Sequence, residues 1–272
     1  MSETLIILGI VALSFALRSF PNRYLRRLGA LGFLAATFFA FYLFTGSFVA
    51  GLSGLLLWFL LPWLELLTRI RRLRLPVGSS LERETPPGSS RFPELSDITD
   101  EVETEGFVYV ADTGWDWDGM HQFYRLFYRA ESREQAAICL TEQEGVAWAS
   151  VSLTSRHPRG TTYRTSNLPF SSPMKMAPDV RLRQVPDSDT FDRLLGQHRE
   201  WMEGLGFEVT DFIEEDPETL AGLIEQETGR QIRHNLDAGL IQLAETAGTF
   251  RYSWRGLFFL YFQLVKDMVR MS

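Results

Sequence analysis

The sequence predicts an integral membrane protein in which N-terminal transmembrane α-helices, three including a helical hairpin, precede a soluble α+β domain with an antiparallel sheet. Two observations carry this prediction. Residues 28–63 contain no charged side chain, which is typical of membrane-spanning helices. Residues 94–248 show short strand-like runs first and helical patterns afterwards, an order that favours helices on one face of an antiparallel sheet.

The uncharged run is too long for one span, because a single helix needs about 20 apolar residues to cross a bilayer. Thr45, Gly46 and Ser47 interrupt it with turn-forming residues, so we expect a hairpin with spans at 28–44 and 48–66. The shorter apolar run 4–20 is preceded only by Glu3, whereas a signal peptide begins with positive charge. We therefore expect a retained first span, with an interfacial segment as the alternative.

Orientation follows from the arginines, because basic residues that flank spans stay in the cytoplasm. One cluster lies at 18–27 and a second at 69–74, so the hairpin places both on the same side. The predicted topology of the unit 1–75 has the N-terminus outside and the C-terminus inside. The expected location is the cell (inner) membrane, multi-pass, with the soluble domain in the cytoplasm.

Small residues recur every four positions in both arms of the hairpin, a spacing that lets helices approach closely. We expect the arms to pack on each other, and the alternative is a face for a second copy or another membrane protein. Neither arm carries an ionisable group, which disfavours a transport function. The candidate interaction residues in the arms are Gly32, Ala36, Ala40, Gly46, Ala50 and Gly54.

After the spans, residues 76–93 are rich in Pro, Gly and Ser and predict a flexible linker. The following domain, 94–248, is predicted to open with a helix at 94–105. Later helices are expected from Phe191, capped by Asp187 or Ser188, and over 217–246, with a bend at Gly229. Alternating runs bounded by turn residues predict the strands 107–111, 121–130, 135–141, 146–155, 161–165 and 180–185.

The tail, residues 249–272, alternates aromatic and polar residues over 249–255, as an edge strand does, and continues as an amphipathic helix. The helical run holds about ten apolar residues, which is too few to span a bilayer. We expect this helix to lie in the membrane interface or to pack on the soluble domain.

The two parts of the chain differ in charge. Residues 1–91 hold ten arginines and four glutamates, a net of +6, and the whole chain is −7, so the remainder is −13. The tail from Thr249 contributes +3, which leaves −16 for residues 92–248. So acidic a domain is repelled by nucleic acid, which is excluded as a partner. Its charge serves solubility or attracts a basic protein surface.

No motif for catalysis, cofactor binding or metal binding is found. Asp112, Asp116 and Asp118 suggest a calcium loop, but Arg125 stands where the loop requires its last glutamate. The single Cys139 lies in an apolar strand and is expected to be inert. Trp115 and Trp117 are candidate contacts for a partner, or fold inward as part of the core.

The predicted function is therefore a membrane-anchored protein that presents an acidic cytoplasmic α+β domain for protein–protein interaction, as an accessory subunit of a membrane complex or by self-association through the hairpin. The alternative is an enzyme at the cytoplasmic membrane surface with its site between sheet and helices. That alternative depends on a cluster of basic residues expected on adjoining strands: His121, Arg125, His157 and Arg159.

Overall fold

The computed structural model describes residues 2–20, 22–78, 80–117, 119–143 and 145–271. It divides the chain into two compact units, and each is considered by itself. Unit 1 comprises Met1–Leu73 and Trp254–Ser272, and unit 2 comprises Arg74–Ser253.

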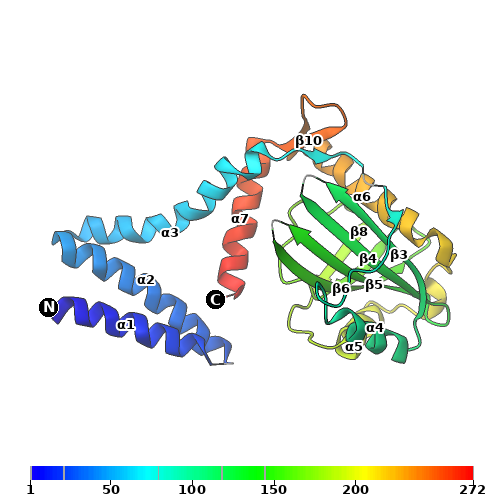
Figure 1. Cartoon of the computed structure of the whole chain (residues 1–272), viewed down its shortest axis with the longest axis horizontal. Coiled ribbons are helices and arrows are strands. Elements are labelled where there is room, and N and C mark those ends of the chain that lie inside the picture. The colour runs from blue at the N-terminus through cyan, green and yellow to red at the C-terminus, as the bar shows by residue number, and fades with distance from the viewer. Residues whose placement is uncertain (1, 21, 79, 118, 144, 272) are drawn as a thin grey trace. The chain divides into compact units, whose positions relative to one another are not determined.

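Unit 1 is entirely helical. It contains α1 (Ser2–Arg18), α2 (Arg23–Thr45), α3 (Phe48–Thr68), a 3-10 turn (Ile70–Arg72) and α7 (Trp254–Met271). Figure 1 shows α1 running beside α2. Within the described part of the chain, two helices are long and apolar enough to cross a membrane, Tyr24–Thr45 and Phe48–Arg72, and Thr4–Arg18 is a shorter apolar helix.

The turn between α2 and α3 forms where the sequence predicts it. Gly46 has a φ of 66°, and its backbone N–H donates to Tyr42 O at 2.7 Å, which ends α2 in the left-handed conformation that glycine accepts most readily. Trp58 Nε1 on α3 donates to Thr37 Oγ1 on α2 at 3.1 Å. The hydrogen bond fixes the two arms against each other.

Helix α7 packs on α3 within unit 1. The Trp63 ring of α3 lies 4.9 Å from the Phe258 ring and 5.1 Å from the Tyr261 ring of α7. Near the start of α7, the Arg71 guanidinium lies 4.4 Å from the centroid of the Trp254 ring. The aromatic residues of the tail helix therefore contact α3 and the segment that follows it.

Unit 2 is an α+β domain with antiparallel sheets, as predicted. Its larger, seven-stranded sheet has the order β2-β3-β4-β5-β6-β7-β8. These strands are β2 (Glu82–Arg83), β3 (Val108–Trp117), β4 (Met120–Arg129), β5 (Glu134–Gln143), β6 (Val146–Arg156), β7 (Thr162–Ser166) and β8 (Val180–Gln184). The helices are α4 (Leu95–Thr104), α5 (Phe191–Gly204) and α6 (Leu220–Asp237), with 3-10 turns at Val209–Asp211 and Pro217–Thr219.

Alternation along the strands divides the core between the two faces of this sheet. Phe123, Phe127, Ile138 and Leu153 point to one face, where they pack with α4 and α5. Leu126, Tyr128 and Ala137 point to the other face, where Leu220 at the start of α6 covers them. The helices therefore lie on both faces (Figure 1), and the prediction that they cover one face is wrong because the side chains of both faces need apolar cover.

Several details of the predicted strands and helices differ in the structure. Strand β8 pairs with β7 in parallel, because residues 167–179 cross over before β8 begins. Helix α6 ends at Asp237, before the predicted end near residue 246, and is uninterrupted at Gly229. Helix α5 is preceded by Thr190, without a side-chain cap, and not by Asp187 or Ser188.

The expected linker 76–93 is partly sheet. Strand β2 pairs with β3, so that Glu82 lies opposite Gly114. The backbone N–H of Glu84 donates to Asp112 O at 3.1 Å, and that of Val77 donates to Gly248 O at 2.9 Å. Pairing satisfies the backbone polar groups of this segment and ties it to unit 2.

The expected edge strand 249–255 is also corrected. Strand β10 (Thr249–Tyr252) is the middle strand of a small sheet, between β1 (Leu75–Pro76) and β9 (Ile241–Leu243). Its aromatic residues Phe250 and Tyr252 are buried. Partners on both sides remove the exposed edge that the alternating pattern suggested.

Candidate functional site

Trp115 and Trp117 lie on strand β3 and not in a turn. Residues two apart in a strand share a face, and both indoles are half-buried. Trp115 Nε1 donates to Gln122 Oε1 at 2.8 Å, and Trp117 Nε1 donates to Arg74 O at 2.7 Å. The tryptophans are therefore held in place with one part of each ring accessible.

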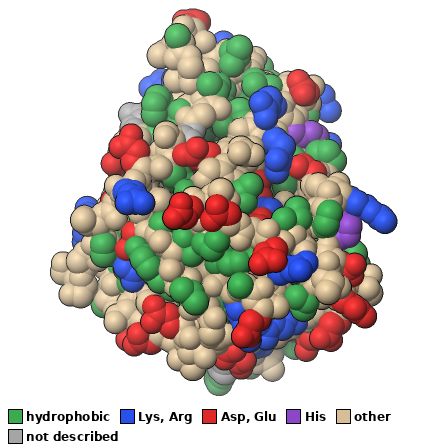
Figure 2. Space-filling view, turned by 90° about the vertical axis from the view of Figure 1, so that its right-hand side faces the viewer, with side chains coloured by type: hydrophobic (Ala, Val, Ile, Leu, Met, Phe, Trp, Pro, Cys, Tyr) green, Lys and Arg blue, Asp and Glu red, His purple; other side chains and the backbone are tan. Residues whose placement is uncertain are grey.

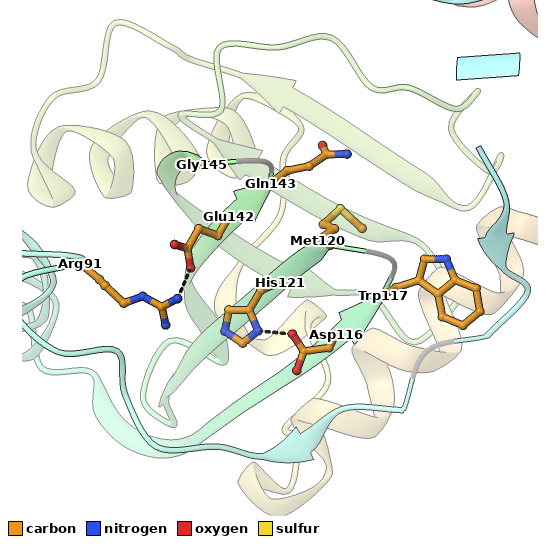
Figure 3. Close-up of a pocket in the computed structure, with 9 residues that line it drawn as sticks. Arg91, Asp116, Trp117, Met120, His121, Glu142, Gln143 and Gly145 are labelled. Carbon is orange, nitrogen blue, oxygen red and sulfur yellow. Dashed lines mark hydrogen bonds and ion pairs between the residues drawn. The ribbon is translucent and has the colours of Figure 1, made fainter. Parts of the chain in front are cut away.

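Trp117 borders an open pocket of about 540 Å³ at the end of the β3–β4 hairpin (Figure 3). Two ion pairs cross this pocket. His121 Nδ1 lies 2.7 Å from Asp116 Oδ1, and Arg91 Nη2 lies 3.2 Å from Glu142 Oε2. The other lining residues are Gly119, Met120, Gln143 and Gly145.

His121 also joins the N-terminal segment of unit 2 to the hairpin. Its Nε2 lies 3.0 Å from Glu84 Oε1, so the imidazole bridges two carboxylates. Burial raises the pKa of Glu84, and the neighbouring His121 opposes that shift. The described residues contain no group of three or more His, Cys, Asp or Glu side chains able to hold a metal ion. Asp118, one of the acidic residues singled out in the sequence, lies outside the described residues.

The remaining acidic residue of the suspected calcium loop has a structural role. Asp112 is buried and accepts from Arg125 Nε and Nη2, both at 2.9 Å. The two residues face each other across β3 and β4. Arg125 also reaches Thr99 Oγ1 of α4 at 3.1 Å, which ties that helix to the sheet.

The structure does not assemble the basic cluster on which the enzyme alternative depends. His121 lies near the end of the sheet where β6 begins, since Met120 pairs with Gln143 and Gln143 pairs with Val146. His157 follows Arg156 at the far end of β6. Eleven residues of strand separate these ends, roughly 35 Å at the usual rise.

His198, on α5, is a core residue with partners for both ring nitrogens. It is fully buried, and its ring nitrogens lie 3.0 Å from Ser155 Oγ and 2.8 Å from Thr165 Oγ1. Burial lowers its pKa to about 4. Burial likewise raises the pKa of Cys139, which disfavours the reactive thiolate.

A buried ion network joins the sheet to α6, and no sequence pattern indicated it. Arg156 Nε donates to Glu227 Oε1 at 2.7 Å, and Arg156 Nη1 donates to Glu215 Oε2 at 2.9 Å. Arg164 Nη2 donates to the other carboxylate oxygen of Glu227. Burial by itself would raise the pKa of Glu227, but Arg164 and Arg156 outweigh it and hold that pKa below its usual value.

The small residues of the α2–α3 hairpin lie in several different surroundings. Gly32 faces α1, where a Cβ atom would overlap the hydroxyl of the buried Ser14. Gly54 faces the Phe41 ring of α2, and Gly46 lies in the turn. Ala36 is buried, whereas Ala40 and Ala50 are half-buried. Two of the small residues thus serve contacts inside unit 1.

Comparison with known proteins adds no assignment: no protein-family model, curated protein or solved structure matches this chain.

Proposed function

We propose that this protein is a membrane-anchored binding module. The helices of unit 1 hold it in the inner membrane as three spans, and unit 2 lies in the cytoplasm and binds a partner protein. The partner binds at the pocket at the end of the β3–β4 hairpin, beside Trp117 (the hairpin pocket).

The observation that carries the anchoring proposal is the apolar surface of α3. Leu56, Leu60 and Leu64 are 55%, 55% and 62% exposed, although a soluble protein buries such side chains. Lipid is the solvent in which this surface is favourable. Glu65, beyond the apolar run, pairs with Arg69 at 3.1 Å, which partly neutralises its charge.

Support for a third span comes from α1, which packs along α2 over Ser14 and Gly32. At 1.5 Å per residue its 17 residues extend about 25 Å, slightly less than the ~30 Å hydrocarbon core. A helix that packs along a spanning neighbour shares its depth. The arginines that flank the α2–α3 helical hairpin, at 18–27 and 69–74, support the proposed orientation.

The hairpin pocket supports protein binding because it combines an accessible aromatic ring with charged groups. Asp116 is 83% exposed, so a basic side chain of a partner can reach it beside its contact with His121. Figure 2 shows acidic side chains interspersed with basic ones on one face of the molecule. Such a mixed surface favours binding through a few paired side chains over long-range attraction to the net charge of the domain.

Orientation is tested with single cysteines in a Cys139→Ala background. Thr45→Cys is exposed in the α2–α3 turn and Glu203→Cys is exposed on α5. A membrane-impermeant maleimide added to intact cells is expected to label the first variant only, and both after lysis. Labelling of Glu203→Cys in intact cells would place unit 2 outside and refute the cytoplasmic assignment.

Partner binding is tested by purifying the tagged full chain in mild detergent at low and high salt. Asp116→Asn is compared with Asp189→Asn, whose side chain is similarly exposed at 81%. A stoichiometric partner retained at low salt and weakened only by Asp116→Asn supports the proposal, because exposed charge pairs are screened by salt. No co-purifying protein at either salt, or equal weakening by both variants, would refute it.

A further inference from the structure

A second cavity of about 310 Å³ lies between the large sheet and α6, on the face opposite α4 and α5. Strands β5 to β8 form its floor, and Ile224, Thr228 and Gln231 of α6 form one wall. The segment 168–176 forms the other wall with Leu168, Met174 and Met176. Ligand pockets in proteins begin at about this size.

The cavity exists because the floor side chains are small. Ala137, Ser152 and Ser166 face one another across β5, β6 and β7, and Ser150 lies beside them. On the opposite face, the same strands carry Ile138 and Leu153, which fill the core under α5. Apolar packing on the α6 side extends to Tyr124 and Ile224, which border the cavity.

Three polar groups that line the cavity can each donate a hydrogen bond to a ligand, and the two serine hydroxyls among them can also accept one. Arg164 Nε donates to Thr154 Oγ1 at 3.2 Å and Nη2 donates to Glu227, but within the described residues Nη1 has no hydrogen bond. The hydroxyls of Ser150 and Ser152 also have no side-chain hydrogen bond in that part of the chain. A ligand group that accepts hydrogen bonds fits this set.

The charged side chains of the cavity indicate which kind of hydrogen-bond acceptor it binds. Arg164 and Glu227 are the charged side chains lining the cavity, and Glu227 already accepts from Arg156, Arg164 and Thr162. The protein thus already donates three hydrogen bonds to the glutamate, whereas the guanidinium still offers a donor. A carboxylate matches a guanidinium better than any neutral acceptor does.

We propose that this cavity binds a small monocarboxylate with an apolar body. Its head group lies between Arg164 Nη1 and the hydroxyls of Ser150 and Ser152, and its body lies against Met174, Met176 and Leu182. At about 30 Å³ per water the cavity corresponds to about ten non-hydrogen atoms, the size of octanoate. This proposal rests on unit 2 alone and is independent of membrane anchoring and of a protein partner.

The test is methyl NMR of the full chain in lipid nanodiscs, with ¹³C-methyl methionine and octanoate as the probe. Met174 and Met176 line the cavity. Met202 is a buried residue of α5 on the other face of the sheet, and Met120 borders the hairpin pocket. Resonances are assigned with single Met→Leu variants. Saturable shifts of Met174 and Met176, with Met120 and Met202 unmoved, are expected. Equal shifts of all four methyls, or none, would overturn the proposal.

Three comparisons sharpen the result. Ser152→Leu fills the floor and is expected to abolish the shifts, while an unchanged Met202 resonance shows that the fold is kept. Arg164→Gln is expected to weaken binding about tenfold, whereas Arg181→Gln, on the exposed side of β8, leaves it unchanged. Octanamide is expected to bind more weakly than octanoate. Equal binding of the two would overturn the assignment of a carboxylate.

Discussion

Arg156 on β6 and Glu227 on α6 are joined by a hydrogen bond of 2.7 Å between Nε and Oε1, and both side chains are buried. Seventy-one residues separate them in the chain. Because Arg156 also binds Glu215, and Arg164 also binds Glu227, α6 is positioned on the sheet by paired charges as well as by apolar contacts. Each charged side chain of this network is paired with an opposite charge, which offsets the cost of removing it from water.

Glu227→Gln is expected to lower the free energy of unfolding of the domain by about 3–5 kcal/mol, because it leaves the buried Arg156 and the half-buried Arg164 short of a counter-charge. Chemical unfolding of the full chain in detergent, followed by tryptophan fluorescence, measures the change. Glu203→Gln, an exposed carboxylate on α5, is the matched control and is expected to change stability by less than about 0.5 kcal/mol. A loss below about 1 kcal/mol for Glu227→Gln would show that the network contributes little.

His198 predicts a dependence of stability on pH. Its pKa is about 4 in the folded protein and about 6.5 in the unfolded chain, so between these values the unfolded state binds more protons. The free energy of unfolding therefore falls by about 1.4 kcal/mol for each unit of pH below 6.5, until pH 4. Unfolding measured across this range for the wild type and for His198→Gln tests it. A variant whose stability falls as steeply as that of the wild type would contradict the assignment.

Gly32→Leu is expected to separate α1 from α2, because even a Cβ atom at this position overlaps Ser14. Gly9→Leu is the control, since no atom lies within 4 Å of a Cβ placed there. The rings of Phe15 and Phe33 lie 4.9 Å apart, so cysteines at these two positions in a Cys139→Ala background report the contact. A short thiol cross-linker should join them in the Gly9→Leu protein and fail in the Gly32→Leu protein. Cross-linking that survives Gly32→Leu would argue against this packing.

His121→Ala is expected to loosen the segment 81–84 from the sheet, because Glu84 loses its partner on β4. Loss of one charge-assisted hydrogen bond corresponds to about tenfold faster amide exchange at Glu84. Hydrogen exchange read by mass spectrometry measures this, with His157→Ala in the β6–β7 turn as the control. Unchanged exchange would mean that backbone pairing alone holds β2.

Local patterns predicted much of this architecture because their periods report backbone conformation directly. The strand expected over 146–155 is β6 at Val146–Arg156, and the turn at Gly46 separates two apolar helices. The prediction of a flexible linker over residues 76–93 missed strand β2 for a related reason. Composition reports how readily a segment folds by itself, and not whether an unpaired edge such as that of β3 is available to it.

The sequence by itself determined the uncharged helical hairpin, the order of strands and helices and the acidic character of the domain. Each of these depends on residues that are neighbours in the chain. Tertiary structure alone decided that Gly32 packs on Ser14, that β8 joins the sheet in parallel and that Arg164 faces Glu227 beside an open cavity. Those contacts join residues far apart in the chain, and a single sequence carries no periodic signal for a pairing made only in the folded state.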